Sequence, residues 1–128
     1  MRACLDTHAV IWSLMDDPLL GSHARRLIAA SSKTDLLVPD MVLLETAMLV
    51  AKGRVQLTGG PESLLAKIGE SFRVVPIDPG IAHLAVALDL PHGDPFDRVI
   101  TATAKVHGIP LLTRDRIITD SGTVETVW

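Results

Sequence analysis

The chain has 128 residues and a mass of 13.8 kDa, which is enough for one domain, residues 1–128, with a single core. Hydrophobic residues make up 48% and charged residues 21%, a composition typical of globular proteins and not of disordered or fibrous ones. The net charge of −3 argues against a protein whose whole surface binds nucleic acid. It does not exclude a nuclease, because acidic residues gathered at a metal site also lower the net charge.

The sequence contains no membrane-spanning pattern, because no stretch approaches the roughly 18 uninterrupted apolar residues that a spanning helix needs. The N-terminal segment reaches Asp6 after a short apolar run and lacks the apolar core of a signal peptide. Cys4 is the one cysteine, which fits a reducing compartment, and it is expected to be a small core residue. We therefore expect a cytoplasmic location.

Short apolar runs predict strands, and the segments between them have helical length. In chain order we expect a strand at 1–5, a helix at 7–15, a helix at 22–32, a strand at 35–39, a helix at 41–52, a helix at 61–71, a strand at 73–77, helices at 79–88 and 95–107, and strands at 109–113 and 123–128. Gly53 and Gly108 follow two helix ends, and Pro61 and Pro79 suit first helical turns. This alternation predicts an α/β domain with a mostly parallel sheet covered on both faces.

Ligands of open α/β sheets bind outside the carboxyl ends of the strands, so acidic residues there are candidates for a site. Asp6 closes the first strand, where a helix N-cap and a site residue fit equally well. Glu45 lies in the nearly uninterrupted apolar run "MVLLETAMLVA", which predicts a buried helix. A buried carboxylate needs a cation or a metal as partner, and we favour a site role for Glu45 over an ion pair.

The stretch "DPFDRVITATA" contains Asp94 and Asp97 at the start of a helix. Both can be explained as capping residues, with Pro95 at the first helical position. A helix needs one cap only, however, and the small residues Ala102 and Ala104 suit a helix that lies close to the sheet. We therefore assign the cap to Asp94, with contact to a metal only through water, and the metal-ligand role to Asp97.

Asp115 follows the apolar run "IPLLT", and Thr113 precedes it by two residues. Taken alone, this pair is typical of a turn or a helix cap. Taken together with Asp6, Glu45 and Asp97, Asp115 completes four carboxylates at one sheet edge, where they would repel one another unless a cation lay among them. An all-oxygen cluster of this kind selects Mg²⁺ or Mn²⁺.

Other kinds of site find less support in the sequence. The histidines lack zinc-ligand spacing, and His8 and His92, both next to the proposed site, are better explained as surface or supporting residues. "LTGGPES" is not a phosphate-binding loop, and no serine lies in a nucleophile elbow. With so few aromatic residues, no base-stacking platform is evident.

Five segments in order, "LDTHAVIW", "VLLE", "LPHGDPFDRVITATA", "GIPLLTRD" and "VETVW", resemble the PIN-domain ribonucleases, and among them the VapC-type toxins of bacterial toxin–antitoxin pairs. The resemblance covers nearly the whole chain. It implies a three-layer α/β/α sandwich with about five strands. It also implies four metal ligands, which match Asp6, Glu45, Asp97 and Asp115, an accessory aspartate that matches Asp94, and a threonine that matches Thr113. The tail lacks the tyrosine that many family members carry.

The leading hypothesis is therefore a Mg²⁺- or Mn²⁺-dependent endoribonuclease that activates water for attack on a phosphodiester bond. Its substrate contacts are expected at Arg98, Arg114, Arg116 and His8. The resemblance further implies an RNA substrate, an antitoxin partner and a homodimer, for which helices in 41–55 and 22–30 are interface candidates unless core packing explains their apolar residues. Two alternatives stay open: a phosphotransfer or phosphohydrolase domain with Asp6 as nucleophile, and a binding module without catalysis.

Overall fold

A computed structural model describes residues 2–56, 58–91 and 93–128. In chain order its elements are β1 (Ala3–Leu5), α1 (Thr7–Leu14), α2 (Ser22–Ala29), the short 3-10 helix η1 (Lys33–Asp35), β2 (Leu36–Pro39), α3 (Asp40–Ala51), α4 (Pro61–Ser71), β3 (Arg73–Val75), α5 (Pro79–Ala87), α6 (Pro95–His107), β4 (Leu111–Leu112), α7 (Arg116–Ser121) and β5 (Thr126–Val127). The strands are shorter than the sequence predicts, and most helix boundaries agree within a few residues.

The strands form one five-stranded sheet in the order β3-β2-β1-β4-β5, and every neighbouring pair is parallel. In the register of the central strand, Cys4 lies opposite Leu37 on one side and Leu111 on the other. From β1 the chain steps outward to β2 and β3, then crosses back to β4 and β5. The direction of winding therefore changes between β1 and β4, which is where such sheets bind ligands.

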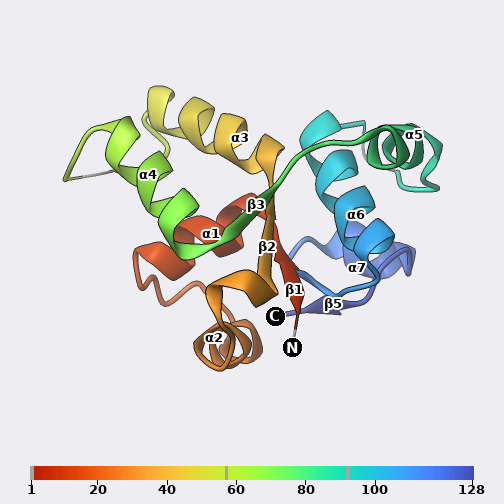
Figure 1. Cartoon of the computed structure of the whole chain (residues 1–128), viewed down its shortest axis with the longest axis horizontal. Coiled ribbons are helices and arrows are strands. Elements are labelled where there is room, and N and C mark those ends of the chain that lie inside the picture. The colour runs from red at the N-terminus through yellow and green to blue at the C-terminus, as the bar shows by residue number, and fades with distance from the viewer. Residues whose placement is uncertain (1, 57, 92) are drawn as a thin grey trace.

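The helices cover both faces of the sheet, as Figure 1 shows: α1 to α4 lie on one side and α5 to α7 on the other. Right-handed crossovers require this division, because the outward steps through β2 and β3 and the return through β4 and β5 run in opposite directions. The prediction of a three-layer α/β/α sandwich with about five parallel strands is confirmed.

The core lies on both faces of the sheet, with residues of α1 and α4 on one side and of α6 on the other. Strands β1 and β2 are buried along their whole length, as expected for central parallel strands. Helix α6 buries every residue from Val99 to Ala104, and both Ala102 and Ala104 are fully buried, so the backbone of α6 approaches the sheet closely. This helix ends at Gly108, whose φ of 65° is the left-handed conformation that favours glycine.

The structure differs from the sequence predictions at two helices. Helix α3 is not a buried helix: Val42 and Thr46 are its buried residues, while Leu44 is 53% exposed. Its apolar character is therefore not explained by core packing alone. Helix α7 is missing from the predicted helices because its six residues are too few to show helical periodicity, although a helix cap was one of the interpretations of Asp115.

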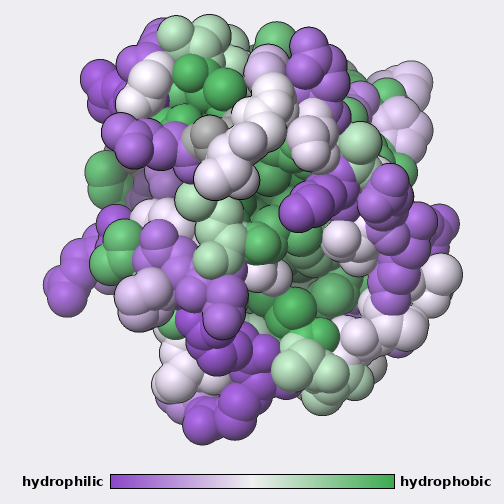
Figure 2. All heavy atoms as spheres, turned by 90° about the vertical axis from the view of Figure 1, so that its left-hand side faces the viewer, coloured by the Kyte–Doolittle hydropathy of each residue, from purple (hydrophilic) through white to green (hydrophobic). Residues whose placement is uncertain are grey.

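The face formed by α1 to α4 carries exposed apolar residues. Figure 2 shows hydrophobic side chains in the middle of this face, bordered by hydrophilic ones. Met15, Leu19, Leu44 and Met48 are among the large apolar residues with substantial exposure. Among the described residues, no helix is long and apolar enough to cross a membrane.

Candidate active site

Three acidic residues lie where neighbouring parallel strands end. Asp6 directly follows β1, Asp115 follows β4 after a short connection, and Glu45 lies in the helix that follows β2. The backbone N–H of Asp6 donates to the carbonyl of Leu112 at 3.2 Å, which fixes the end of β1 against the end of β4. These residues therefore come together at the carboxyl edge of the sheet, at the point where the winding changes direction.

A cavity of about 510 Å³ opens at this edge, and we call it the acidic pocket. It is lined by Asp6, Thr7, His8, Glu45, Asp94, Asp97, Arg114, Asp115, Arg116 and Ile117. Five of these side chains are carboxylates, and they come from four separate parts of the chain. The structure thus brings every acidic residue selected from the sequence into one cavity.

Asp6 is held by contacts from two directions. Its Oδ1 caps α1 by accepting from the backbone N–H of Ala9 at 2.8 Å, and the hydroxyl of Thr113 also hydrogen-bonds its carboxylate. Burial raises the pKa of Asp6; the hydrogen bonds from Thr113 and Ala9 and the nearby His8 oppose that rise, and the charge of Glu45 adds to it. A neighbouring cation would relieve the cost of this ionised carboxylate.

Glu45 accepts a hydrogen bond from the hydroxyl of Thr7, which is buried directly after Asp6. The contact joins α1 to α3 and orients the glutamate toward the acidic pocket. The sequence analysis did not select Thr7 as a functional residue. Its signal was present in "DTH", where a hydroxyl next to the first aspartate begins a helix facing the pocket.

Asp94 and Asp97 both lie at the start of α6, and the expected cap at Asp94 is confirmed. Asp94 is exposed and caps the helix, with its Oδ1 accepting from the backbone N–H of Phe96 at 2.9 Å. Asp97 lies in the first turn, is half-buried and lines the acidic pocket. His92, the histidine closest to this pair in sequence, lies outside the described residues.

Asp115 caps α7, and its Oδ1 accepts from the backbone N–H groups of Ile117 at 2.8 Å and Ile118 at 3.1 Å. Its own N–H donates to the hydroxyl of Thr113 at 3.1 Å. Because the same hydroxyl also bonds Asp6, Thr113 connects two of the carboxylates and fixes their separation. Thr113 itself is buried behind the pocket wall.

Arg98 does not have the role expected from the sequence. Its guanidinium donates to backbone carbonyls around the end of α5, at Ala85 (2.7 Å), Val86 (3.2 Å), Leu88 (2.6 Å) and Leu90 (2.8 Å). Two of these carbonyls belong to the last turn of α5 and two to the segment after it, so the arginine closes the α5–α6 connection. We therefore no longer assign Arg98 to phosphate binding.

The other expected basic residues do border the acidic pocket. His8, Arg114 and Arg116 are exposed and line it. The Cζ of Arg114 lies 4.4 Å from the ring centroid of Trp12, and the His8 ring lies 5.1 Å from the same indole. Trp12 thus holds two positively chargeable groups at the edge of the carboxylate cluster.

The donor set of the acidic pocket fits a hard divalent cation, because it consists of carboxylate oxygens without thiol or imidazole ligands in the cluster. Within the described ranges, no three His, Cys, Asp or Glu side chains already stand close enough together to hold a metal ion. Cys4 cannot contribute, because it is fully buried and burial raises its thiol pKa.

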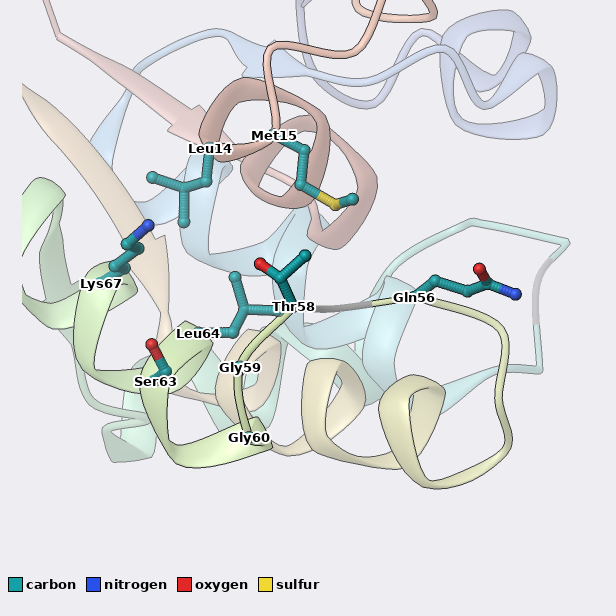
Figure 3. A pocket seen from close by; sticks show the side chains of 9 residues that line it. All are labelled: Leu14, Met15, Gln56, Thr58, Gly59, Gly60, Ser63, Leu64 and Lys67. Atoms are coloured by element: carbon teal, nitrogen blue, oxygen red, sulfur yellow. The ribbon is translucent and has the colours of Figure 1, made fainter.

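A second cavity, of about 250 Å³, lies at the other end of α1 and has a different lining. Figure 3 shows Leu14 and Met15 at the end of α1 across from Leu64 and Lys67 of α4, with Thr58 between them. No carboxylate lines this groove in the described part of the chain. Its lining is mixed, with Leu14, Met15 and Leu64 as the large apolar side chains and polar side chains between them.

Comparison of the sequence with known proteins identifies a family and a relative. A family model for the PIN domain matches residues 3–121. Ribonuclease VapC22 of Mycobacterium tuberculosis (strain ATCC 25618 / H37Rv) is 37% identical over 113 residues, which cover 88% of this chain and 85% of that protein.

Solved structures are similar over almost the whole length. VapBC2 from Rickettsia felis, bound to a DNA fragment from its promoter, gives a TM-score of 0.74 at 15% identity, covering 99% of this chain and 98% of that one. VapC20 of Mycobacterium tuberculosis, a sarcin-ricin loop cleaving toxin, gives 0.67 at 21% identity, covering 97% and 98%. At these identities the two structures bear on the fold alone.

Proposed function

The chain belongs to the PIN-domain family and is of the VapC type, and on that premise we propose that it is a divalent-metal-dependent endoribonuclease, the toxin of a bacterial toxin–antitoxin pair. The observation that carries this proposal is the convergence of five carboxylates in the acidic pocket, with Arg114 and Arg116 at its border. The ribonuclease VapC22, similar over most of the chain, supports the choice of RNA as substrate.

In the proposed site, Asp6, Glu45, Asp97 and Asp115 hold Mg²⁺ or Mn²⁺. When bound, such an ion lowers the pKa of a water and neutralises the charge that develops on the phosphate. A carboxylate of the cluster accepts the proton of the attacking water, and no covalent intermediate with the protein forms. Asp94 supports the site by starting α6 and holding Asp97 one turn further along.

The protein residues around the cluster keep it in position. Thr7 holds Glu45, and Thr113 holds Asp6 and Asp115. Arg114 and Arg116 contact the RNA backbone on either side of the scissile phosphate, where their charge offsets that of the carboxylates. His8, at the start of α1, contributes a further contact to the RNA.

The test is RNA cleavage by the wild-type protein and the variant Asp97→Asn, with Asp94→Asn as a matched control. In Mn²⁺ we expect the wild type to cleave single-stranded RNA and Asp97→Asn to lose at least about 100-fold, since a ligand is removed while the fold is kept. Asp94→Asn retains a capping side chain and should lose much less. Equal activity of the wild type and Asp97→Asn would refute the assignment.

We further propose that an antitoxin binds the apolar face formed by α1 to α4 (Figures 2 and 3) and that two copies of the chain form a homodimer. The exposed residues Leu44 and Met48 of α3, and the groove between α1 and α4 with Leu14, Met15 and Leu64 in its lining, support contacts with a protein partner. Co-expression with an antitoxin encoded by a neighbouring open reading frame should relieve growth arrest caused by this chain. The substitution Met15→Lys, far from the acidic pocket, should weaken that relief and leave RNA cleavage intact.

A further inference from the structure

A cavity of about 480 Å³ adjoins the acidic pocket on the side of α7 and β5. The two cavities share Arg114 and Arg116 in their linings, so these arginines form the border between them. Trp128 also lines this cavity, which we call the tryptophan cavity. Asp120 is the acidic residue in its described lining, and it is outnumbered by the two arginines.

Trp12 connects Arg114 to Trp128, because its ring contacts both side chains. Arg114 lies over the Trp12 ring at 4.4 Å, and the Trp12 and Trp128 rings meet edge to face with their centroids 5.8 Å apart. Trp12 is 9% exposed and acts as a fixed support, whereas Trp128 is only partly buried and lines the tryptophan cavity. The support therefore orients both a guanidinium and an accessible indole.

Trp128 is also held through its backbone. Its carbonyl oxygen accepts from a ring nitrogen of His23 at 3.0 Å, and the preceding carbonyl of Val127 accepts from the N–H of Thr113 at 3.2 Å. A Cβ on Gly21 would lie 2.6 Å from the indole Cδ1, so glycine permits the close approach of α2 to this ring. An aromatic ring fixed in advance loses little conformational entropy when a ligand stacks on it.

Sites that bind single-stranded nucleic acid combine positive charge with aromatic side chains. Arginine contacts the phosphate, and the aromatic ring stacks with the base. The volume of the cavity is within the range of sites that hold a small ligand of nucleotide size. In its lining the hydroxyl of Thr126 donates to the hydroxyl of Thr119 at 3.0 Å. The indole of Trp128 is the aromatic surface of the cavity.

We propose that the tryptophan cavity binds the nucleotide adjacent to the scissile phosphate, with its base stacked on Trp128 and its phosphate between Arg114 and Arg116. This inference rests on the proposed RNA cleavage in the acidic pocket and adds a specific subsite to it. The chain then prefers single-stranded RNA, because a base within a duplex cannot leave its stack to reach the indole without added cost.

The test combines a change in the protein with a change in the RNA. The inactive variant Asp97→Asn is titrated with a short single-stranded RNA, and then with the same RNA carrying one abasic residue at successive positions. At one position we expect the loss of the base to weaken binding at least about fivefold, the lower end of the range for one stacked base. In Asp97→Asn/Trp128→Leu, the same abasic residue should cost nothing further. Trp128→Phe, which keeps an aromatic ring, should restore most of the sensitivity.

Two controls separate a structural from a binding role for Trp128. The abasic RNA tests the subsite in a protein whose tryptophan is intact, so instability of Trp128→Leu cannot produce the expected result. The intrinsic fluorescence of Asp97→Asn should also be quenched by the RNA, and more strongly than in Asp97→Asn/Trp128→Phe, because Trp12 is the one tryptophan remaining in the latter.

The proposal is overturned if no abasic position matters, if the penalty is unchanged in Trp128→Leu, or if only a polypeptide antitoxin and never RNA quenches the indole. Wild-type cleavage assays on the same RNA separate the two proposals. Cleavage without coupling between the base and Trp128 would remove the subsite and leave the nuclease. Coupling without cleavage would leave an RNA-binding subsite and remove the nuclease.

Discussion

The hydroxyl of Thr113 hydrogen-bonds the carboxylate of Asp6, and this contact opposes the effect of burial on the pKa of that carboxyl group. Replacement by Thr113→Val removes a bond to the ionised form, so the pKa of Asp6 should rise further. Protons then compete better with a cation, and the acid limb of the cleavage profile should move to higher pH, with more Mn²⁺ required at acidic pH. Thr113→Ser keeps the hydroxyl and should resemble the wild type. An unchanged pH profile in Thr113→Val would show that the contact does not tune Asp6.

The raised pKa of Asp6 also predicts how stability depends on pH without metal. A group whose pKa is higher in the folded than in the unfolded protein stabilises the fold when protonated, and this contribution is lost as the pH rises through the folded pKa. Asp6→Asn mimics the protonated form and keeps a capping side chain. In EDTA, therefore, the melting temperature of Asp6→Asn should exceed that of the wild type at neutral pH, and the difference should shrink as the pH falls. A larger difference at acidic pH would contradict the raised pKa.

The bond from Thr7 to Glu45 is predicted to serve the site more than the fold. Thr7→Val keeps the shape and removes the donor, which should cost about 1 kcal/mol of stability because Glu45 is only partly buried. Cleavage should fall more, about tenfold, because Glu45 loses its orientation. Thermal unfolding and initial cleavage rates measure the two effects, and Thr7→Ser provides the matched control. A stability loss with full activity would make Thr7 a purely structural residue.

Arg98 and Arg116 should respond to substitution in opposite ways. Arg98→Lys cannot reproduce the contacts to four carbonyls around the end of α5, so it should lower stability by about 2 kcal/mol with little change in the RNA affinity of the folded protein. Arg116→Gln should leave the melting temperature unchanged and should weaken RNA binding. It should also reduce the salt dependence of binding by about one phosphate contact. The reverse outcome would return Arg98 to the substrate contacts.

The acidic residues could be predicted from sequence because each lies at a position that topology brings to one sheet edge. Parallel strands align their carboxyl ends, so Asp6 and Asp115 converge whatever the details of packing. Asp97 could be separated from Asp94 because a helix uses one cap, and the small residues of α6 indicated close packing on the sheet. These inferences needed only that the strands are parallel and that a helix starts at Asp94.

Other features depend on tertiary contacts that no local pattern carries. Whether an apolar helix is buried depends on what packs against it, and α3 leaves Leu44 exposed. An arginine after an acidic residue can face solvent or turn back to the preceding helix, as Arg98 does. The role of Trp128 required the positions of Trp12 and Arg114, which are far from each other in sequence.

The central claim is that a divalent cation in the acidic pocket contacts the scissile phosphate, and metal rescue tests it most directly. RNA is prepared with sulfur replacing one non-bridging oxygen at the mapped cleavage position, separately for each stereoisomer. We predict that wild-type cleavage of one isomer falls by at least about tenfold in Mg²⁺, which binds sulfur poorly, and recovers in Mn²⁺. Cleavage that persists in EDTA, or a sulfur effect that Mn²⁺ does not relieve in either isomer, would contradict a metal ion at the reacting phosphate.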